Sequence, residues 1–337
     1  MGGTSSNLIT PGFLLPYARP ATVSDYRAAT NASGTMAVFE RTVAKSAGGS
    51  GQPQLYILDL TGSGALPAPF LGGSPAILTS TRPDWSWSND QIAFNYSGDV
   101  MVGVVSATGQ DPKLFGGITA RMNYPTWFPD GGTLATESAN GTPNPNTTVI
   151  SAASGATVKT ALEGAGLWGG MPSVNPVNPN LIAFAGHAWV EGQPYQQDFN
   201  YIYVMDLSSG NPPVPLEAQA PASGPYDPSF QGRAPWWSPD GKWVVFESNR
   251  LCQPPANNGA GMYAIFLYAY RGPNPAMQVT DTSYNCNHAK WYPNGFPGSP
   301  AGPFQLIVSA WQPNGSDAPS WPYGLAVLNL TPLGITF

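Results

Sequence analysis

Two histidines, His187 and His288, are the first residues of the sequence that could do acid–base chemistry. An imidazole titrates near neutral pH, so a histidine beside a cation can move a proton on a polar substrate. Arg250 begins a long predicted loop and is the candidate cation. The three residues therefore suggest a catalytic site. The alternative is that both histidines are surface or capping residues.

Residues typical of metal and cofactor sites are missing from the sequence. There is no third histidine, and the two cysteines, Cys252 and Cys286, do not form a Cys-x-x-Cys motif. No Gly-x-Ser-x-Gly nucleophile motif occurs. We therefore predict no metal and no cofactor.

The charge of the chain argues against two classes of partner. The 13 Lys and Arg residues are scattered singly among 19 Asp and Glu residues, which gives a net charge of -6. Binding of nucleic acid or of an anionic membrane surface needs several cations on one face. Nor can the longest apolar run, at 262–270, cross a bilayer as a helix. We predict no nucleic-acid partner and no membrane insertion.

The composition indicates a folded all-β chain that is rich in turns. Gly (39) and Pro (37) are frequent, yet 42% of the residues are hydrophobic and 12% are aromatic, which is enough for a core. Short apolar runs rich in Val, Ile, Tyr and Phe alternate with turn clusters.

An internal repeat sets the architecture. Residues 235–248 contain a strand, a Pro-Asp-Gly turn and a second strand, and similar segments occur at 124–138 and 82–94. Three weaker copies bring the total to six, and a third and often a fourth strand follow each copy. This pattern predicts a six-bladed β-propeller of four-stranded antiparallel blades. The predicted blades are approximately 24–72, 80–116, 120–162, 168–218, 230–281 and 285–337.

The repeat resembles that of a known family. Trp-Ser-Pro-Asp-Gly-Lys-Trp-Val-Val-Phe-Glu-Ser-Asn-Arg at 237–250, with Ile-Tyr-Val-Met-Asp-Leu at 202–207, resembles the TolB-like propeller repeat. The resemblance covers about 24–330 and implies the fold rather than a function, because such propellers have many functions. The chain has neither TolB's N-terminal domain nor a peptidase domain, so we expect a stand-alone propeller. Either residues 7–15 of the N-terminal segment 1–23 or residues 334–337 would complete the last blade, and we favour the former.

Long loops indicate which face of the propeller binds. The segments between second and third strands are long in five of the six blades and would lie together on one face, called here the loop-rich face. Aromatic and cationic residues expected there are predicted to bind a ligand: Trp168, Trp189, Tyr195, Trp311, Trp321, Arg82, Arg121 and Arg233. Alternatively, the loops are decoration and the charges balance around a water-filled channel. Trp85, Trp127, Trp237 and Trp291 recur at one repeat position and are predicted to form the blade core.

The cysteines bear on location. The order of strands places Cys252 and Cys286 on the loop-rich face of the same or neighbouring blades, which predicts a disulfide, although both could be unrelated small core residues. A lasting disulfide implies an oxidising compartment. The first residues lack the cationic and apolar parts of a signal peptide. We therefore predict a periplasmic or secreted protein whose signal peptide has been removed.

Three functional hypotheses follow. The first is an extracytoplasmic binding or scaffold propeller that holds a protein or a glycan on the loop-rich face. The second is a carbohydrate lyase or hydrolase with His187 and His288 at the channel mouth. The third is a structural subunit of a surface assembly. Catalysis would require both histidines and an arginine to converge within about 8 Å in one pocket, because both groups must reach one substrate.

Overall fold

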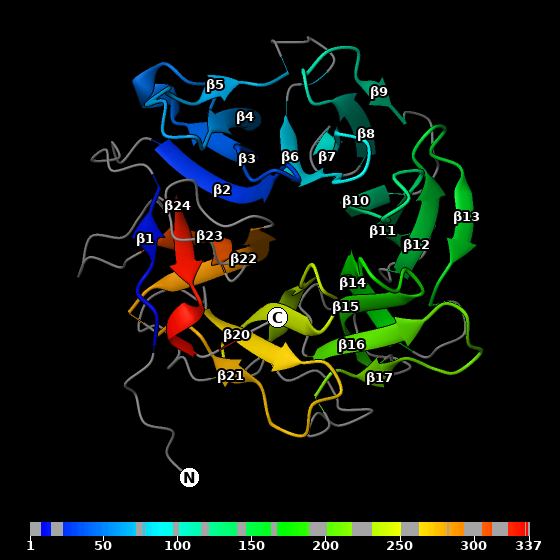
Figure 1. The fold of residues 1–337 in the computed structure, drawn as a ribbon. Helices are drawn as coiled ribbons and strands as arrows, with labels where there is room; N and C mark the ends of the chain where they lie inside the picture. Colours follow the sequence, from blue (N-terminus) through cyan, green and yellow to red (C-terminus); the bar gives the residue numbers. More distant parts are fainter. Residues whose placement is uncertain are drawn as a thin grey trace.

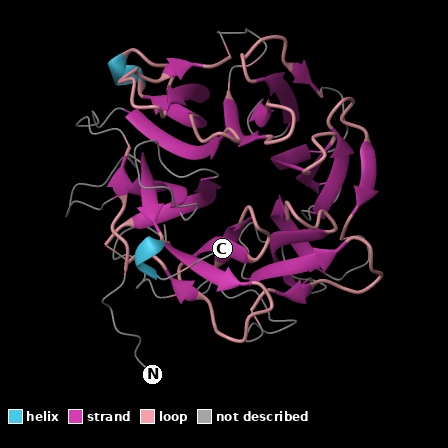
Figure 2. Cartoon of the chain, viewed as in Figure 1, coloured by secondary structure: helices cyan, strands magenta, loops and turns pink. Residues whose placement is uncertain are grey.

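The structure is a ring of six β-sheets around a central channel (Figure 1). The computed structural model describes residues 8–14, 23–71, 77, 79–96, 101–115, 121–139, 146–162, 167–188, 201–217, 231–250, 263–281, 283–292, 305–311, 323–333 and 335. Within these residues the helical segments are two short 3-10 turns, η2 (Lys45–Ala47) and η3 (Thr331–Leu333) (Figure 2). None of the described helical segments is long and apolar enough to cross a membrane. The predicted all-β, six-bladed propeller is confirmed.

Each blade runs from an inner strand beside the channel to an outer strand at the rim. Blades 1 to 3 consist of β2 (Val23–Thr30), β3 (Met36–Val43), β4 (Pro53–Asp59) and β5 (Ala68–Pro69); β6 (Ser80–Trp85), β7 (Gln91–Tyr96), β8 (Met101–Ser106) and β9 (Lys113–Leu114); and β10 (Arg121–Trp127), β11 (Thr133–Ala139), β12 (Asn146–Ser151) and β13 (Thr157–Thr160). Blades 4 to 6 consist of β14 (Leu167–Val174), β15 (Leu181–Ala188), β16 (Tyr201–Asp206) and β17 (Val214–Pro215); β18 (Gly232–Trp237), β19 (Trp243–Ser248), β20 (Ala264–Ala269) and β21 (Met277–Gln278); and β22 (Asn285–Tyr292), β23 (Gln305–Trp311), β24 (Gly324–Asn329) and β1 (Gly12–Phe13).

The outer strand of blade 6 comes from the opposite end of the chain. β1 pairs antiparallel with β24, so that Gly12 lies opposite Val327 and Phe13 opposite Ala326. Gly12 and Phe13 of the N-terminal segment therefore occupy this position. Pairing the two ends in one sheet covers an edge that would otherwise be free.

Apolar side chains between neighbouring blades form the core. Six buried clusters occur, one at each junction, and the last joins blade 6 to blade 1. The four repeated tryptophans take equivalent places and are 8% exposed or less, which confirms their assignment to the core: Trp85, Trp127, Trp237 and Trp291. They lie opposite apolar residues of the second strand: Ile92, Leu134, Val244 and Leu306.

A β-bulge in every inner strand shapes the channel. The register shifts by one residue in all six, and one residue at each bulge has a positive φ of 46–50°: Arg27, Arg82, Tyr124, Met171, Ala234 and His288. This conformation is unfavourable for residues with a Cβ, so it persists only where surrounding contacts hold it.

Side chains of the preceding blade hold five of the six bulges. The backbone N–H groups of Arg27, Arg82, Tyr124, Met171 and His288 donate, in that order, to Ser309, Glu40, Asn95, Glu137 and Glu247. These acceptors occupy the same place on the second strand of their blades, where blade 4 has Ala185. The bulges therefore bring the polar groups of neighbouring blades together at the channel.

Candidate functional site

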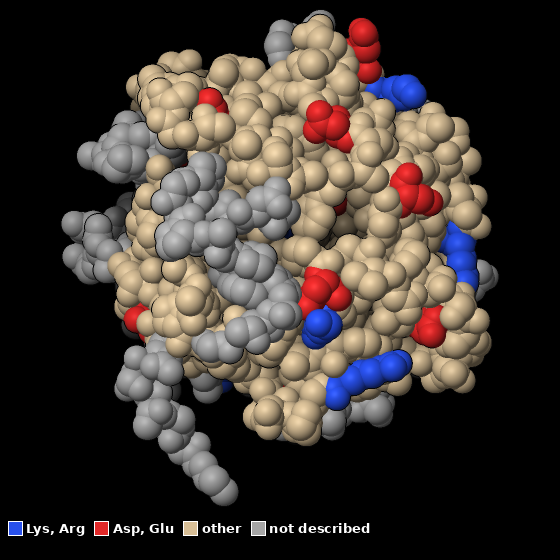
Figure 3. Space-filling view, in the orientation of Figure 1, with Lys and Arg blue, Asp and Glu red and all other residues tan. Residues whose placement is uncertain are grey.

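The described part of the channel contains a wide and a narrow cavity. The wide cavity has a volume of about 310 Å³ and is lined by residues of the turns between first and second strands, including Trp87, Ser88 and Pro129. The narrow cavity, of about 50 Å³, lies at the level of the six bulges. Trp236 and Lys290 line both, so the cavities follow one another along the channel. The space-filling view shows the ring hollowed at its centre, with charged side chains spread over the face in view, either alone or beside one of opposite sign (Figure 3).

The wide cavity is mainly aromatic and has one ion pair in its lining. Trp127, Trp236 and Phe128 contribute apolar surface. Lys290 reaches from blade 6 to blade 2, where its Nζ donates to Pro83 O at 2.8 Å and to Asp84 Oδ1 at 3.1 Å. The same ammonium lies 4.1 Å from the centre of the Trp236 ring, a cation–π contact. Burial lowers the pKa of Lys290, while the charge of Asp84 opposes this shift.

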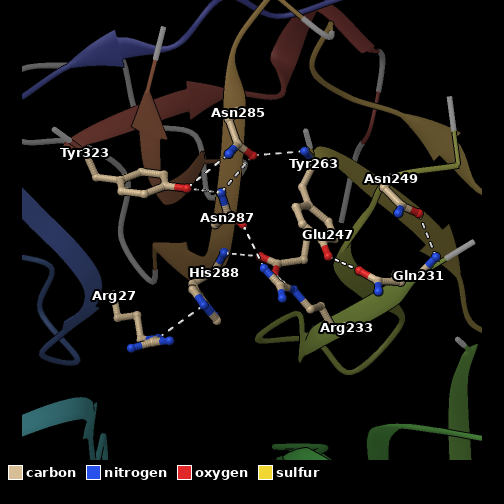
Figure 4. Close-up of polar contacts among 10 residues, drawn as sticks. All are labelled: Arg27, Gln231, Arg233, Glu247, Asn249, Tyr263, Asn285, Asn287, His288 and Tyr323. Carbon is tan, nitrogen blue, oxygen red and sulfur yellow. Dashed lines mark hydrogen bonds and ion pairs between the residues drawn. The ribbon is translucent and has the colours of Figure 1, made fainter. Parts of the chain in front are cut away.

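The narrow cavity is surrounded by charged and aromatic side chains. Arg27 donates from Nη1 to both carboxylate oxygens of Glu40, at 3.1 and 3.2 Å. Its Nε donates to His288 Nε2 at 3.1 Å (Figure 4). Arg82 lies with its guanidinium carbon 4.3 Å from the centre of the Tyr124 ring. The charge of Arg82 also opposes the burial that raises the pKa of Glu137. Lys290 of blade 6 also lines this cavity, so three blades contribute cations to one layer of the channel.

A second ion pair lies beside His288. Arg233 Nε is 2.5 Å from Glu247 Oε1, and its Nη2 donates to Asn287 Oδ1 at 3.3 Å (Figure 4). Glu247 also accepts the backbone N–H of His288. Burial raises the pKa of Glu247, and the charge of Arg233 opposes that shift. The guanidinium carbon of Arg233 also lies 4.0 Å from the centre of the Tyr263 ring, a cation–π contact.

His288 is placed as a hydrogen-bond acceptor and not as a free base. Its Nε2 accepts from Arg27, so a neutral ring carries its proton on Nδ1. Burial is the main cause that lowers the pKa of His288 well below its usual value, and Arg27, Arg233, Arg82 and Lys290 lower it further. A base whose lone pair is occupied and whose charged form is disfavoured is a poor proton acceptor.

The neutral state of His288 predicts a pH-dependent stability. Below about pH 6.5 the unfolded chain protonates this histidine while the folded protein does not, so stability should fall as the pH falls. His288→Gln keeps an acceptor for Arg27 and removes the titration. Its stability relative to wild type should therefore improve by up to about 1.4 kcal/mol per pH unit between pH 6.5 and 5. Glu247, whose raised pKa acts in the opposite direction, is common to both proteins. Urea unfolding at several pH values measures this difference, and a pH-independent difference would contradict the assignment.

The three catalytic candidates lie in different places. His187 is on β15 of blade 4, where its ring packs edge-on against Trp168 at 5.0 Å. Arg250 pairs with Glu217 through bonds of 2.7 and 2.8 Å. Neither lines the cavity beside His288. Among the described residues the convergence that catalysis would require is therefore not found.

The predicted ligand-binding residues do not lie together in one site. Arg82 lines the narrow cavity, whereas Arg233 does not line it and pairs with Glu247. Trp168 is only 6% exposed, so the expectation of an exposed aromatic is wrong there, because the residue lies within inner strand β14. Trp311, the last residue of β23, is half-buried. Three predicted residues lie outside the described residues: Trp189, Tyr195 and Trp321. The side chain of Arg121, the first residue of β10, is also outside them.

The predicted disulfide is not supported. Cys286 is 0% exposed and packs in the core cluster between blades 5 and 6. Cys252 lies outside the described residues, and those that are described contain no disulfide. They also contain no group of three side chains placed to hold a metal ion.

The sequence analysis missed Arg27, Glu40 and the Lys290–Asp84 pair. A signal was present in the repeat itself. Glu40, Glu137 and Glu247 stand at one position of three second strands, and Arg27, Arg82 and His288 stand at one position of three inner strands. Comparison of equivalent positions for charge would have found them.

Comparison with known proteins shows the fold. No protein-family model and no curated protein matches the sequence. Among solved structures, a putative TolB from Agrobacterium tumefaciens is similar, with 17% identity over 77% of this chain and 76% of that chain and a TM-score of 0.50. TolB from Acinetobacter baumannii has 18% identity over 97% of this chain and 73% of that chain, with a TM-score of 0.48. The protein is a six-bladed β-propeller. More particularly, its fold is TolB-like.

Proposed function

We propose that this protein is a non-catalytic binding propeller that holds a segment of a partner protein in the wide cavity of its channel. The observation that carries the proposal is the cavity of about 310 Å³. Its volume is at the lower end for ligand pockets, which suits one or two inserted side chains.

The chemistry of the lining favours an apolar side chain. Trp87, Phe128, Pro129 and Trp236 supply apolar surface, and buried anchors of this kind supply most of the affinity in protein interfaces. The Lys290 ammonium and the Asp84 carboxylate already bond to one another. They can orient a polar group of the partner without leaving a buried charge unpaired.

Three alternatives to this proposal remain. Indole rings also stack on sugars, so a glycan ligand is the second candidate. The loop-rich face, whose predicted aromatic residues are mostly outside the described residues, remains a predicted site for either ligand. A carbohydrate-active enzyme is less well supported, because His187, Arg250 and His288 do not share a cavity. A structural subunit of a surface assembly remains a third hypothesis.

A periplasmic or secreted location is part of the proposal and depends on the predicted pairing of Cys252 with Cys286. Thiol counting on the unfolded, unreduced protein tests it. The described residues contain no disulfide, which predicts two reactive thiols and would remove the argument for an oxidising compartment, whereas a protein without reactive thiols would restore it.

Replacement of Trp87 by alanine tests the binding site. Trp87 is half-buried, and its Nε1 donates to Thr30 O at 3.1 Å, which fixes the ring at the cavity. Peptides selected on the wild-type protein from a displayed random library should bind Trp87→Ala with affinity lower by about 2 kcal/mol, or roughly 30-fold. Isothermal titration calorimetry measures this change.

Trp311→Ala is the matched control, because Trp311 does not line the cavity. If the wide cavity holds the peptides, this variant should bind them as wild type does, and a loss of affinity would instead indicate the loop-rich face. Equal affinity of Trp87→Ala and wild type would exclude the wide cavity as the peptide site. Binding on a glycan array that Trp87→Ala abolishes, without peptide binding, would favour the glycan alternative.

A further inference from the structure

Cations from three blades line the narrow cavity. Arg27 comes from β2, Arg82 from β6 and Lys290 from β22, and His288 and Tyr124 complete the polar part of the lining. No carboxylate is among the described residues that line it. The cavity thus presents positive groups to a space of about 50 Å³.

The carboxylates that balance these cations lie farther from the channel axis. Glu40, Glu137 and Glu247 are on the second strands β3, β11 and β19, behind the inner strands. Asp84 faces the wide cavity instead. The field in the narrow cavity is therefore positive, although the surroundings as a whole are nearly neutral.

Donors remain for a ligand in the narrow cavity. Arg27 uses Nε and Nη1 for His288 and Glu40, and no described residue accepts a hydrogen bond from its Nη2. Lys290 has three N–H donors and uses two, for Pro83 and Asp84. Inside a protein, where water screens charge weakly, such donors bind an anion more strongly than they would at the surface.

We propose that the narrow cavity binds one small monovalent anion, such as chloride, between Arg27, Arg82 and Lys290. Its volume exceeds the roughly 30 Å³ that one water occupies in the liquid, which leaves room for a single small ion. The site adjoins the wide cavity, with which it shares Lys290 and Trp236, but it does not depend on the proposed protein partner.

Charge balance makes the binding depend on pH. Four cations and four carboxylates surround His288: Arg27, Arg82, Arg233 and Lys290, and Glu40, Asp84, Glu137 and Glu247. Their charges cancel, so a bound anion leaves one excess negative charge. The rings of Tyr26 and Tyr124 also pack against the His288 ring. A proton on His288, or on Glu137 or Glu247, whose pKa burial raises, would remove that excess. The anion should therefore bind more tightly at low pH.

Thermal unfolding of the full chain in chloride and in gluconate, at equal ionic strength, tests the proposal. Gluconate is too large for the cavity. Chloride should raise Tm by about 2–4 °C relative to gluconate, because a ligand of the folded state stabilises it. The rise should be larger at pH 5.5 than at pH 8. Arg82→Gln should abolish it.

Arg41→Gln is the control for removal of a buried arginine. Arg41 pairs with Asp25 at 2.6 Å and does not line the cavity, so this variant should keep the chloride-dependent rise even if its Tm is lower. An equal rise in Arg82→Gln and in wild type, or no rise at either pH, would overturn the proposal. If Arg82→Gln does not fold, anomalous diffraction from wild-type crystals soaked in bromide tests the anion site instead. An anomalous peak beside Arg27 and Lys290 supports the site, and a channel without one refutes it.

Discussion

Replacing Glu247 by alanine should lower the free energy of unfolding by about 3–5 kcal/mol. Glu247 is wholly buried, and its carboxylate holds both the Arg233 guanidinium and the backbone N–H of His288. Its removal leaves a largely buried cation without a counter-charge and a bulge without its acceptor. Urea unfolding followed by tryptophan fluorescence measures the loss.

Two further variants separate the causes. Glu247→Gln keeps oxygen and shape but removes the charge, so it should lose less than Glu247→Ala. Lys242→Ala breaks the exposed pair with Asp240, in which the lysine is 70% exposed, and should cost less than about 1 kcal/mol. If Glu247→Ala unfolds at the same urea concentration as Lys242→Ala, the channel ion pairs do not stabilise the fold.

Replacing Trp237 by alanine should also destabilise the protein by about 3–5 kcal/mol, because the indole is 2% exposed and fills the junction between blades 4 and 5. Trp311→Ala should have a much smaller effect, because Trp311 is half-buried at the end of a strand. Differential scanning calorimetry of both variants measures the contrast.

Trp311→Ala, together with Trp189→Ala, also tests the loop-rich face. If that face binds the partner, Trp311→Ala, and likewise Trp189→Ala, should keep a normal Tm and lose affinity. If both melt normally and bind normally, the face takes no part in binding. Early melting of Trp311→Ala would instead place this residue in the core.

The blades could be predicted because local and global signals agree in them. Asp240 and Gly241 form the turn that their sequence indicates, with Gly241 at a φ of 69°. The apolar residues that follow, at 243–246, form a continuous run, as is typical of a strand buried between neighbours. The six copies of this sequence pattern therefore predict six blades.

The bulges could not be predicted by the same reasoning. Four of the six bulge residues precede a proline, as Arg82 precedes Pro83 and Tyr124 precedes Pro125. A residue before proline usually has an extended conformation, so local rules predict an uninterrupted strand there. Contacts with the preceding blade outweigh this preference, and such contacts are not visible in a local pattern.

Long-range contacts also explain what was missed at the site. Arg27 and His288 bond across a separation of 261 residues, because the ring brings its first and last blades together. The order of strands predicted both His187 and His288 at the channel mouth on the loop-rich face, but only His288 lines the narrow cavity. It fixes the face of a propeller on which a residue lies, whereas the position around the ring depends on blade number.

The pairing of β1 with β24 has a consequence for how the protein unfolds. A linear array of repeats has two end units, each with a single neighbour, and it can lose structure from those ends. Here every blade has two neighbours, and the core cluster between blades 6 and 1 completes the circle. Fraying one repeat at a time would first require two junctions to separate. The circle should therefore melt as a single cooperative unit despite its modular sequence.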